Sequence, residues 1–167
     1  METGPRVFEA NTVFDTPGLA LRHAHQLLRL RECGGVATVT WKGPPAPGPH
    51  KDREEIETSV GDADALRRLW ERLGFLPVFR YEKYRTTFRA AEPEGLAVLD
   101  ETPIGCFLEL EGPPAWIDKK AQMLGFNADE YITESYAALF FSYCERTGQA
   151  AEHMVFGAGG LCLGDSP

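Results

Sequence analysis

Residues 27–42 read LLRLRECGGVATVTWK, and this stretch decides the predicted fold. Two runs of alternating side chains flank Gly34-Gly35, a dipeptide typical of the tight turn in a β-hairpin. A strand sends successive side chains to opposite faces of its sheet. The first run therefore places leucines on one face and two arginines, Arg29 and Arg31, on the other.

Further strand-like segments extend this hairpin in both directions, and helical segments interrupt or follow them. The predicted strands are residues 7–15, 27–33, 36–42, 53–60, 76–90, 96–101 and 106–111. The predicted helices are residues 62–73, 116–124 and 129–146. Short strands with turn signals between them favour a single α+β domain, in which an antiparallel β-barrel of seven strands has helices packed outside.

Charged or polar residues recur at every second position in five of the predicted strands. These residues are Arg29 and Arg31, Thr40 and Lys42, Arg53, Glu55 and Glu57, Lys83 and Arg85, and Glu109 and Glu111. Apolar side chains such as Leu28, Val39 and Leu108 occupy the opposite faces and need cover, which outer helices would supply. We therefore expect the charged faces to point into the barrel, although a charged run on one isolated strand more often faces solvent.

A lumen lined with charge indicates a ligand of matching chemistry, because buried charges are costly unless they are paired or hydrogen-bonded. Six basic groups suit a ligand with several phosphates, since guanidinium groups pair with phosphate oxygens through two hydrogen bonds. The four glutamates of these strands suit hard divalent cations such as Mg²⁺ or Mn²⁺, which prefer oxygen ligands.

Six short motifs follow one another along the predicted strands. They are residues 28–31 (LRLR), 40–43 (TWKG), 53–57 (REEIE), 83–85 (KYR), 99–101 (LDE) and 107–112 (FLELEG). Their order and spacing resemble the CYTH superfamily, the triphosphate tunnel metalloenzymes, and most closely its class IV adenylyl cyclase-like subgroup. The resemblance implies an eight-stranded antiparallel barrel that binds a triphosphate with Mg²⁺ or Mn²⁺. It also implies an enzyme that cyclises ATP to cyclic AMP or hydrolyses thiamine triphosphate or inorganic triphosphate.

The resemblance also implies roles for individual residues of the tunnel and a domain boundary. The phosphate-binding candidates are Arg29, Arg31, Arg53, Lys83 and Arg85. The metal-binding candidates are Glu55, Glu57, Glu109 and Glu111. Lys42 and Asp100 line the tunnel, and either is a candidate for proton transfer. The CYTH-like domain is expected to span residues 1–156, followed by a flexible glycine-rich tail at 157–167.

One signature of the family, an N-terminal E-x-E-x-K strand, is missing from this sequence. Seven strands are therefore predicted where the family has eight, and an incomplete barrel leaves two strand edges without partners. Three explanations stay open. The chain is truncated at its start, two copies complete each other as a homodimer, or the protein is a noncatalytic polyphosphate-binding module.

The composition argues against nucleic acids and membranes as partners. The 167 residues carry a net charge of −8, which argues against nonspecific binding to nucleic acid or to an anionic membrane surface. No apolar run approaches the roughly 20 residues that a membrane span needs. The N-terminus lacks the pattern of a signal peptide, so a cytoplasmic location is expected. The expected partner is a triphosphate-containing small molecule such as ATP, thiamine triphosphate or inorganic triphosphate.

Overall fold

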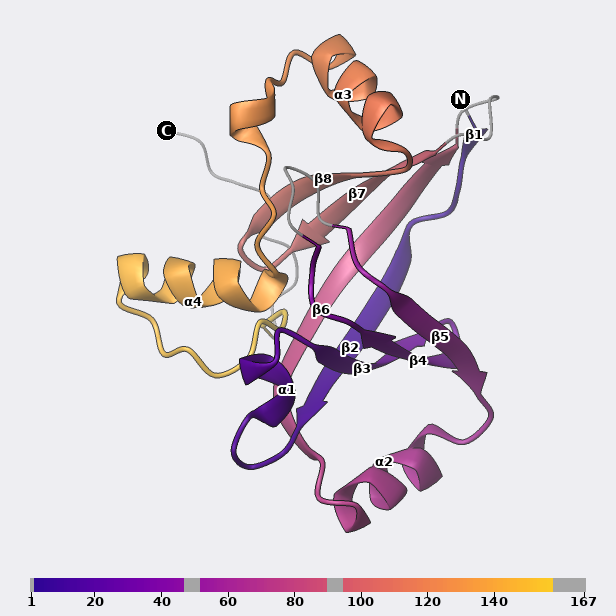
Figure 1. The fold of residues 1–167 in the computed structure, drawn as a ribbon, viewed down its shortest axis with the longest axis vertical. Coiled ribbons are helices and arrows are strands. Elements are labelled where there is room, and N and C mark those ends of the chain that lie inside the picture. Colours follow the sequence, from indigo (N-terminus) through magenta and orange to yellow (C-terminus); the bar gives the residue numbers. More distant parts are fainter. Residues whose placement is uncertain (1, 47–51, 90–94, 158–167) are drawn as a thin grey trace.

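The computed structural model describes residues 2–46, 52–89 and 95–157, and these contain one antiparallel sheet (Figure 1). Its main strands follow the order β5-β4-β3-β2-β6-β7-β8. They are β2 (Val7–Asp15), β3 (Leu27–Cys33), β4 (Val36–Lys42), β5 (Glu55–Val60), β6 (Leu76–Arg89), β7 (Leu96–Thr102) and β8 (Gly105–Glu111). A short strand, β1 (Glu2–Thr3), pairs with the far end of β6. The seven predicted strands are therefore all present, with small shifts at their ends.

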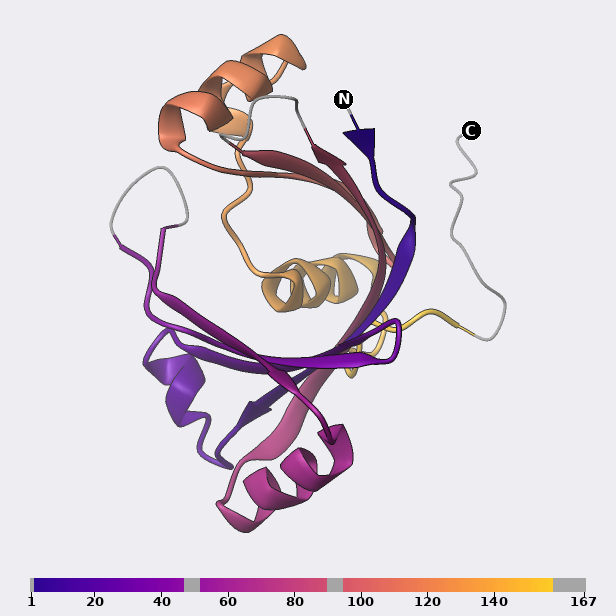
Figure 2. The same ribbon diagram turned by 90° about the vertical axis from the view of Figure 1, so that its right-hand side faces the viewer.

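The sheet curls strongly about its long axis, so that one face is concave and the other convex (Figure 2). The long central strand β6 joins the two halves of the curl, because it pairs with β2 on one side and with β7 on the other. Within the described residues, β5 pairs only with β4 and β8 pairs only with β7. The two halves therefore face each other across the concavity without strict closure of the sheet.

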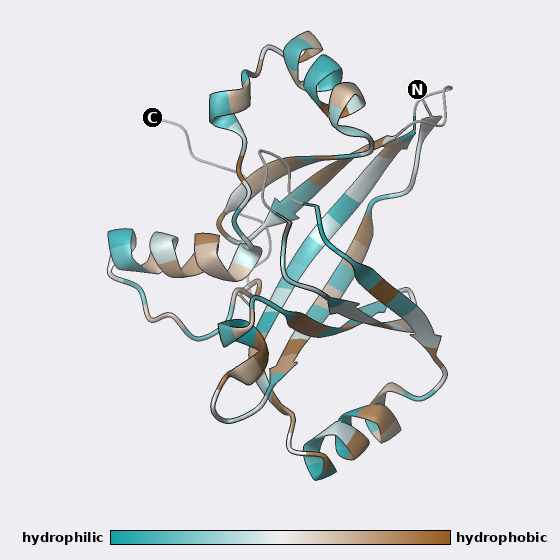
Figure 3. Ribbon diagram, in the orientation of Figure 1, coloured by the Kyte–Doolittle hydropathy of each residue, from teal (hydrophilic) through white to brown (hydrophobic). Residues whose placement is uncertain are grey.

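Helix α2 (Ala63–Arg72) covers part of the convex face. Asp62 is its N-cap, and the Asp62 side chain accepts a hydrogen bond from Ala65 N at 2.8 Å. The apolar side of the helix packs against a core that includes Phe14 and Leu30, while its charged side faces water (Figure 3). Helix α1 (Ala20–His23) is a single turn between β2 and β3.

Helix α4 (Tyr136–Thr147) lies on the concave side of the sheet, where it closes one end of the curl (Figure 2). Phe140 and Cys144 of α4 pack against Phe79 and Tyr81, which project from β6. The helix predicted at 129–146 was wrong at its start, because Ser135 provides the N-cap and accepts from Ala138 N at 3.2 Å. A separate short 3-10 turn (Ala128–Glu130) precedes it.

Helix α3 (Pro114–Met123) follows β8 and packs Trp116 into the core beside the start of β7. Within the described ranges, the helices are all too short or too polar to cross a membrane. Nearly all of the predicted tail at 157–167 lies outside the described residues.

Candidate functional site

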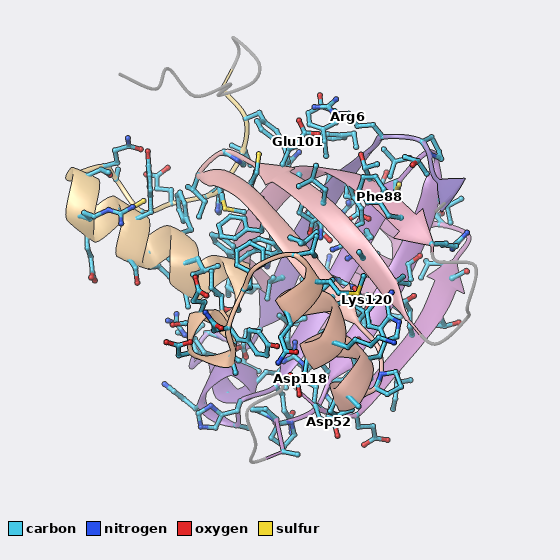
Figure 4. The ribbon with its side chains drawn as sticks, turned by 90° about the horizontal axis from the view of Figure 1, so that it is seen from above. Arg6, Asp52, Phe88, Glu101, Asp118 and Lys120 are labelled. Carbon is cyan, nitrogen blue, oxygen red and sulfur yellow. The ribbon has the colours of Figure 1, made fainter. Side chains whose placement is uncertain are left out.

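The strand register places the predicted charged residues on one face of the sheet, because residues directly opposite each other point to the same side. Arg29 lies opposite Thr40, and Thr40 lies opposite Glu57. On the other half of the sheet, Arg85 lies opposite Asp100. The contacts below put these side chains on the concave face, as the alternation predicts. An ion pair on the convex face, Arg6 with Glu101, lies apart from them (Figure 4).

Arg29 lies in the half formed by β3, β4 and β5, where it is 7% exposed. Its Nη2 donates to Thr40 Oγ1 at 2.9 Å, and its Nη1 donates to Tyr81 Oη at 3.4 Å. Thr40 in turn donates to Glu57 Oε2 at 2.7 Å. Two neutral oxygens therefore orient this guanidinium. Its Nη2 lies 3.7 Å from Glu57 Oε2.

Lys42 and Arg53 share one carboxylate at the same end of this half. Lys42 Nζ donates to Glu55 Oε1 at 2.5 Å, and Arg53 Nε lies 3.6 Å from the same atom. Burial lowers the pKa of Lys42 from its ordinary value. The hydrogen bond that Lys42 donates to Glu55 opposes this lowering, and the charge of nearby Arg29 adds to it. Lys42 is therefore easier to deprotonate than a free lysine, which suits a group that transfers protons.

Asp100 organises the opposite half, and it is fully buried. Lys83 Nζ donates to its Oδ2 at 2.6 Å, while Arg85 donates to both of its oxygens at 2.7 and 2.6 Å. Burial alone would raise the pKa of Asp100, but the hydrogen bonds and charges of Arg85 and Lys83 outweigh it and lower the pKa to about 2. Asp100 is therefore ionised throughout the physiological range, and it holds two of the candidate phosphate-binding groups in place.

The first residue of α4 contributes a further contact that sequence analysis did not identify. Tyr136 Oη donates to Asp100 Oδ2 at 2.8 Å, and the Lys83 ammonium lies 5.2 Å from the centre of its ring. Burial, followed by the charges of Glu109 and Asp100, raises the pKa of Tyr136. The hydroxyl therefore stays protonated and acts only as a donor toward these carboxylates.

The remaining candidate metal ligands lie on the edge strand β8. Glu109 Oε2 accepts from Arg85 Nη2 at 2.5 Å, and Glu111 Oε1 lies 3.9 Å from Arg85 Nη1. These two carboxylates and their counterparts on β5, Glu55 and Glu57, are all more exposed than Asp100.

In the part of the chain that the structure describes, no three acidic, His or Cys side chains are grouped as a metal site. The carboxylates nevertheless fit Mg²⁺ or Mn²⁺ on chemical grounds. Mg²⁺ is commonly held by one or two carboxylates, with phosphate oxygens and water completing its ligands. The pairs on β5 and β8 supply that number of oxygens beside groups that would hold phosphates.

The floor of the concave face contains two polar residues of β2 that were not predicted as site residues. Glu9 lies opposite Lys83, and Asn11 is the next residue on the same face of β2. Glu9 Oε2 is 3.3 Å from Arg31 Nε and 3.6 Å from Lys83 Nζ, and Asn11 Oδ1 accepts from Arg31 Nε at 3.1 Å. Glu9 therefore links the two halves of the charged face. The same two-residue alternation that identified the other strands is present at residues 9–11.

The predicted site residues thus gather on the concave face, with Arg53 joining them through Glu55 just before the start of β5. Three basic groups are held through the acceptors described above: Arg29 by Thr40, and Lys83 and Arg85 by Asp100. Such fixed cations are preorganised for an anion, because little side-chain freedom remains to be lost on binding.

Comparison with known proteins gives consistent results. The sequence model of the CYTH domain family matches residues 2–124. A relative from Methanocaldococcus jannaschii, named "Putative adenylate cyclase", is 30% identical over 142 residues, which cover 79% of this chain and 81% of that protein.

Solved structures also resemble this fold. A protein from Pyrococcus horikoshii is 25% identical, with a TM-score of 0.75, over 85% of this chain and 88% of that one. A protein from Hippeastrum, described as a "Putative adenylyl cyclase" with a dominant triphosphatase activity, is 20% identical. Its TM-score is 0.59 over 90% of this chain and 85% of that one, so the likeness concerns the fold.

Proposed function

Because this chain belongs to the CYTH domain family, we propose that it is an enzyme that binds a triphosphate on its concave face with a divalent metal and cleaves one of its phosphoanhydride bonds. The observation that carries this proposal is the arrangement of basic groups on that face. Arg29, Arg31, Lys83 and Arg85 project into one concavity from two facing halves of the sheet. Such groups bind phosphate oxygens through charge-assisted hydrogen bonds.

The other residues have supporting roles in this proposal. Glu55, Glu57, Glu109 and Glu111 would hold Mg²⁺ or Mn²⁺, which would neutralise charge on the phosphate oxygens. Arg53 would extend the phosphate-binding set beside Glu55. Of the two candidates for proton transfer, Lys42 is favoured because its pKa is lowered by burial, whereas Asp100 is saturated with donors and would position Lys83 and Arg85.

The products decide between the activities that this proposal includes. ATP, thiamine triphosphate and inorganic triphosphate should each be incubated with the protein and Mg²⁺ or Mn²⁺. We expect metal-dependent release of orthophosphate or diphosphate from at least one of them. A cyclase releases cyclic AMP and diphosphate from ATP, whereas a hydrolase adds water. The complete absence of turnover with all three substrates and both metals would refute the proposed enzyme.

A second function, a noncatalytic polyphosphate-binding module, is favoured by one observation. The carboxylates on β5 and β8 already contact basic or hydroxyl groups, and no group of three metal-ligating side chains occurs in the described ranges. This alternative predicts that inorganic triphosphate raises the melting temperature of the protein without any turnover. Thermal unfolding and product analysis on the same sample therefore separate the two functions.

A further inference from the structure

Three buried side-chain atoms on the concave face have no hydrogen-bond partner within the described residues. They are Glu9 Oε2, Asn11 Nδ2 and Arg29 Nε. Glu9 and Asn11 are only 4% and 0% exposed. Buried polar atoms are nearly always hydrogen-bonded to protein or to ordered water, so this group indicates a small polar occupant.

The orientation of the Asn11 amide follows from its neighbour. Arg31 Nε can only donate a hydrogen bond, so the Asn11 atom that faces it at 3.1 Å must be the oxygen. The amide nitrogen is then left as a donor without a partner. Glu9 Oε2, which lies 3.3 Å from the same Arg31 Nε, is an acceptor without a well-aligned donor. A free donor and a free acceptor therefore belong to two residues that both lie beside Arg31 Nε.

This donor and acceptor lie beside the groups that would hold phosphate. Glu9 Oε2 is 3.6 Å from Lys83 Nζ. Arg31 makes its protein contacts through Nε, and neither of its terminal amino groups has a hydrogen-bond partner among the described residues. A phosphoryl group that bound to Lys83 and to the terminal amino groups of Arg31 would therefore lie next to Glu9.

We propose that Glu9 and Asn11 hold the water molecule that attacks the terminal phosphorus of the triphosphate, which makes this chain a hydrolase. The inference rests on the proposed function and assigns its reaction. Asn11 Nδ2 donates to the water oxygen, while Glu9 Oε2 accepts one of the water protons. The carboxylate and amide together fix the direction of the lone pair that attacks.

The reaction step balances without any further reagent. The water oxygen forms a bond to the terminal phosphorus as its proton passes to Glu9 Oε2. The bond between that phosphorus and the bridging oxygen breaks, and its electron pair remains on the leaving diphosphate. The proton is later released to solvent. A loose phosphoryl-transfer transition state needs a well-placed water more than a strong base, so a carboxylate beside two cations is adequate.

The burial of Glu9 and Asn11 argues against a ribose hydroxyl as the attacking group. In cyclisation the attacking group is a ribose hydroxyl, which carries the bulk of a nucleoside with it. Glu9 and Asn11 lie on the floor of the sheet between β3 and β6, and they are almost completely buried. A single water needs only two to four polar partners, so it is a far smaller nucleophile for such a position than a nucleoside hydroxyl.

The first test follows the oxygen of the attacking water in the unaltered protein. The reaction is run in ¹⁸O-labelled water with inorganic triphosphate and with ATP, and with Mg²⁺ or Mn²⁺. We expect one labelled oxygen in the orthophosphate, and ADP rather than cyclic AMP from ATP. Cyclic AMP as the sole nucleotide product, or label in the diphosphate alone, would overturn this inference but leave the triphosphate-processing function standing.

The second test compares E9Q and N11A with a matched control, E32Q. Glu32 lies on β3 but points to the convex face, where it pairs with Arg67 of α2. We expect kcat to fall about 100-fold or more in E9Q and to fall in N11A, with the melting shift caused by triphosphate retained. E32Q should keep the full kcat.

Hydrolysis by E9Q at the unaltered rate would overturn the inference, and so would triphosphate binding by the unaltered protein without any hydrolysis. Loss of both binding and turnover in the unaltered protein would refute the proposed function itself.

Discussion

Asp100 is the residue whose charge matters most for this face, because four hydrogen bonds from three side chains converge on its carboxylate. Its neighbours Lys83 and Arg85 are candidate phosphate-binding groups. A buried carboxylate with these partners serves to fix the cations and to balance their charge while no ligand is present. Its position between them explains why the concave face is stable although it is rich in charge.

The effect of Asp100 on stability depends on pH in a defined direction. Its pKa falls from 3.8 in the unfolded chain to about 2 in the fold. A lowered pKa means that its contribution is fully present above the unfolded value and is lost as the pH falls toward 2. We predict that D100N lowers the free energy of unfolding by about 3 to 5 kcal/mol at neutral pH, because the buried Lys83 and the partly buried Arg85 lose their partner.

The difference between D100N and the unaltered protein should shrink between pH 4 and pH 2. Urea unfolding at several pH values measures it. D64N is the matched control, since Asp64 lies exposed on α2 and pairs with Arg67 alone among the described residues. A difference that is independent of pH down to 2 would contradict the role assigned to Asp100.

At the scale of elements, α4 connects the core to the charged face. Its apolar residues pack against Phe79 and Tyr81, and its first residue, Tyr136, reaches Asp100. The backbone of Met154 forms a parallel bridge with Tyr81, which secures the segment after α4 against β6. The helix is therefore held at both of its ends, and it completes the wall beside Lys83.

We predict that Y136F lowers the free energy of unfolding by about 2 kcal/mol, since a buried carboxylate loses one hydrogen bond while the ring is retained. It should also weaken triphosphate binding, because Asp100 and Lys83 become less well fixed. Y143F is the matched control on the same helix and should change stability by less than about 0.5 kcal/mol. Chemical unfolding and calorimetric titration check both effects. Equal behaviour of the two variants would argue against a positioning role for the Tyr136 hydroxyl.

The strands could be predicted from sequence because their pattern is local. Alternation of charged and apolar residues identified β3 and β8, and the dipeptide Gly34-Gly35 marked their hairpin with β4. The predicted roles of the charged residues remain predictions, but their shared face follows directly from the two-residue period. Glu9 and Asn11 show the same two-residue period, but they lie outside the six motifs from which the site residues were predicted.

Other features depended on contacts that no local pattern contains. The start of α4 was predicted six or seven residues too early, because helical propensity did not reveal that Ser135 caps the helix. Nothing in the sequence around Tyr136 indicates that it meets Asp100, which is 36 residues away and on another element. The position of α4 on the concave side is likewise a result of tertiary packing.

At the scale of the whole molecule, the charge of the site differs from that of the chain. The chain carries a net charge of −8, whereas the six basic groups of the concave face lie among six carboxylates, those of Glu9, Glu55, Glu57, Asp100, Glu109 and Glu111. In the part of the chain that the structure describes, the outer strands β5 and β8 do not pair with each other. The homodimer, one of three explanations left open by the sequence, remains a prediction.

The account depends most on the claim that this face binds a triphosphate, and calorimetric titration with inorganic triphosphate and Mg²⁺ tests it most directly. We predict saturable 1:1 binding by the unaltered protein and by R6M, whose arginine lies on the convex face with Glu101. R31M should bind at least about tenfold more weakly, because charge-assisted hydrogen bonds to phosphate are lost. Absence of binding by the unaltered protein, or equal affinity in R31M and R6M, would contradict the account.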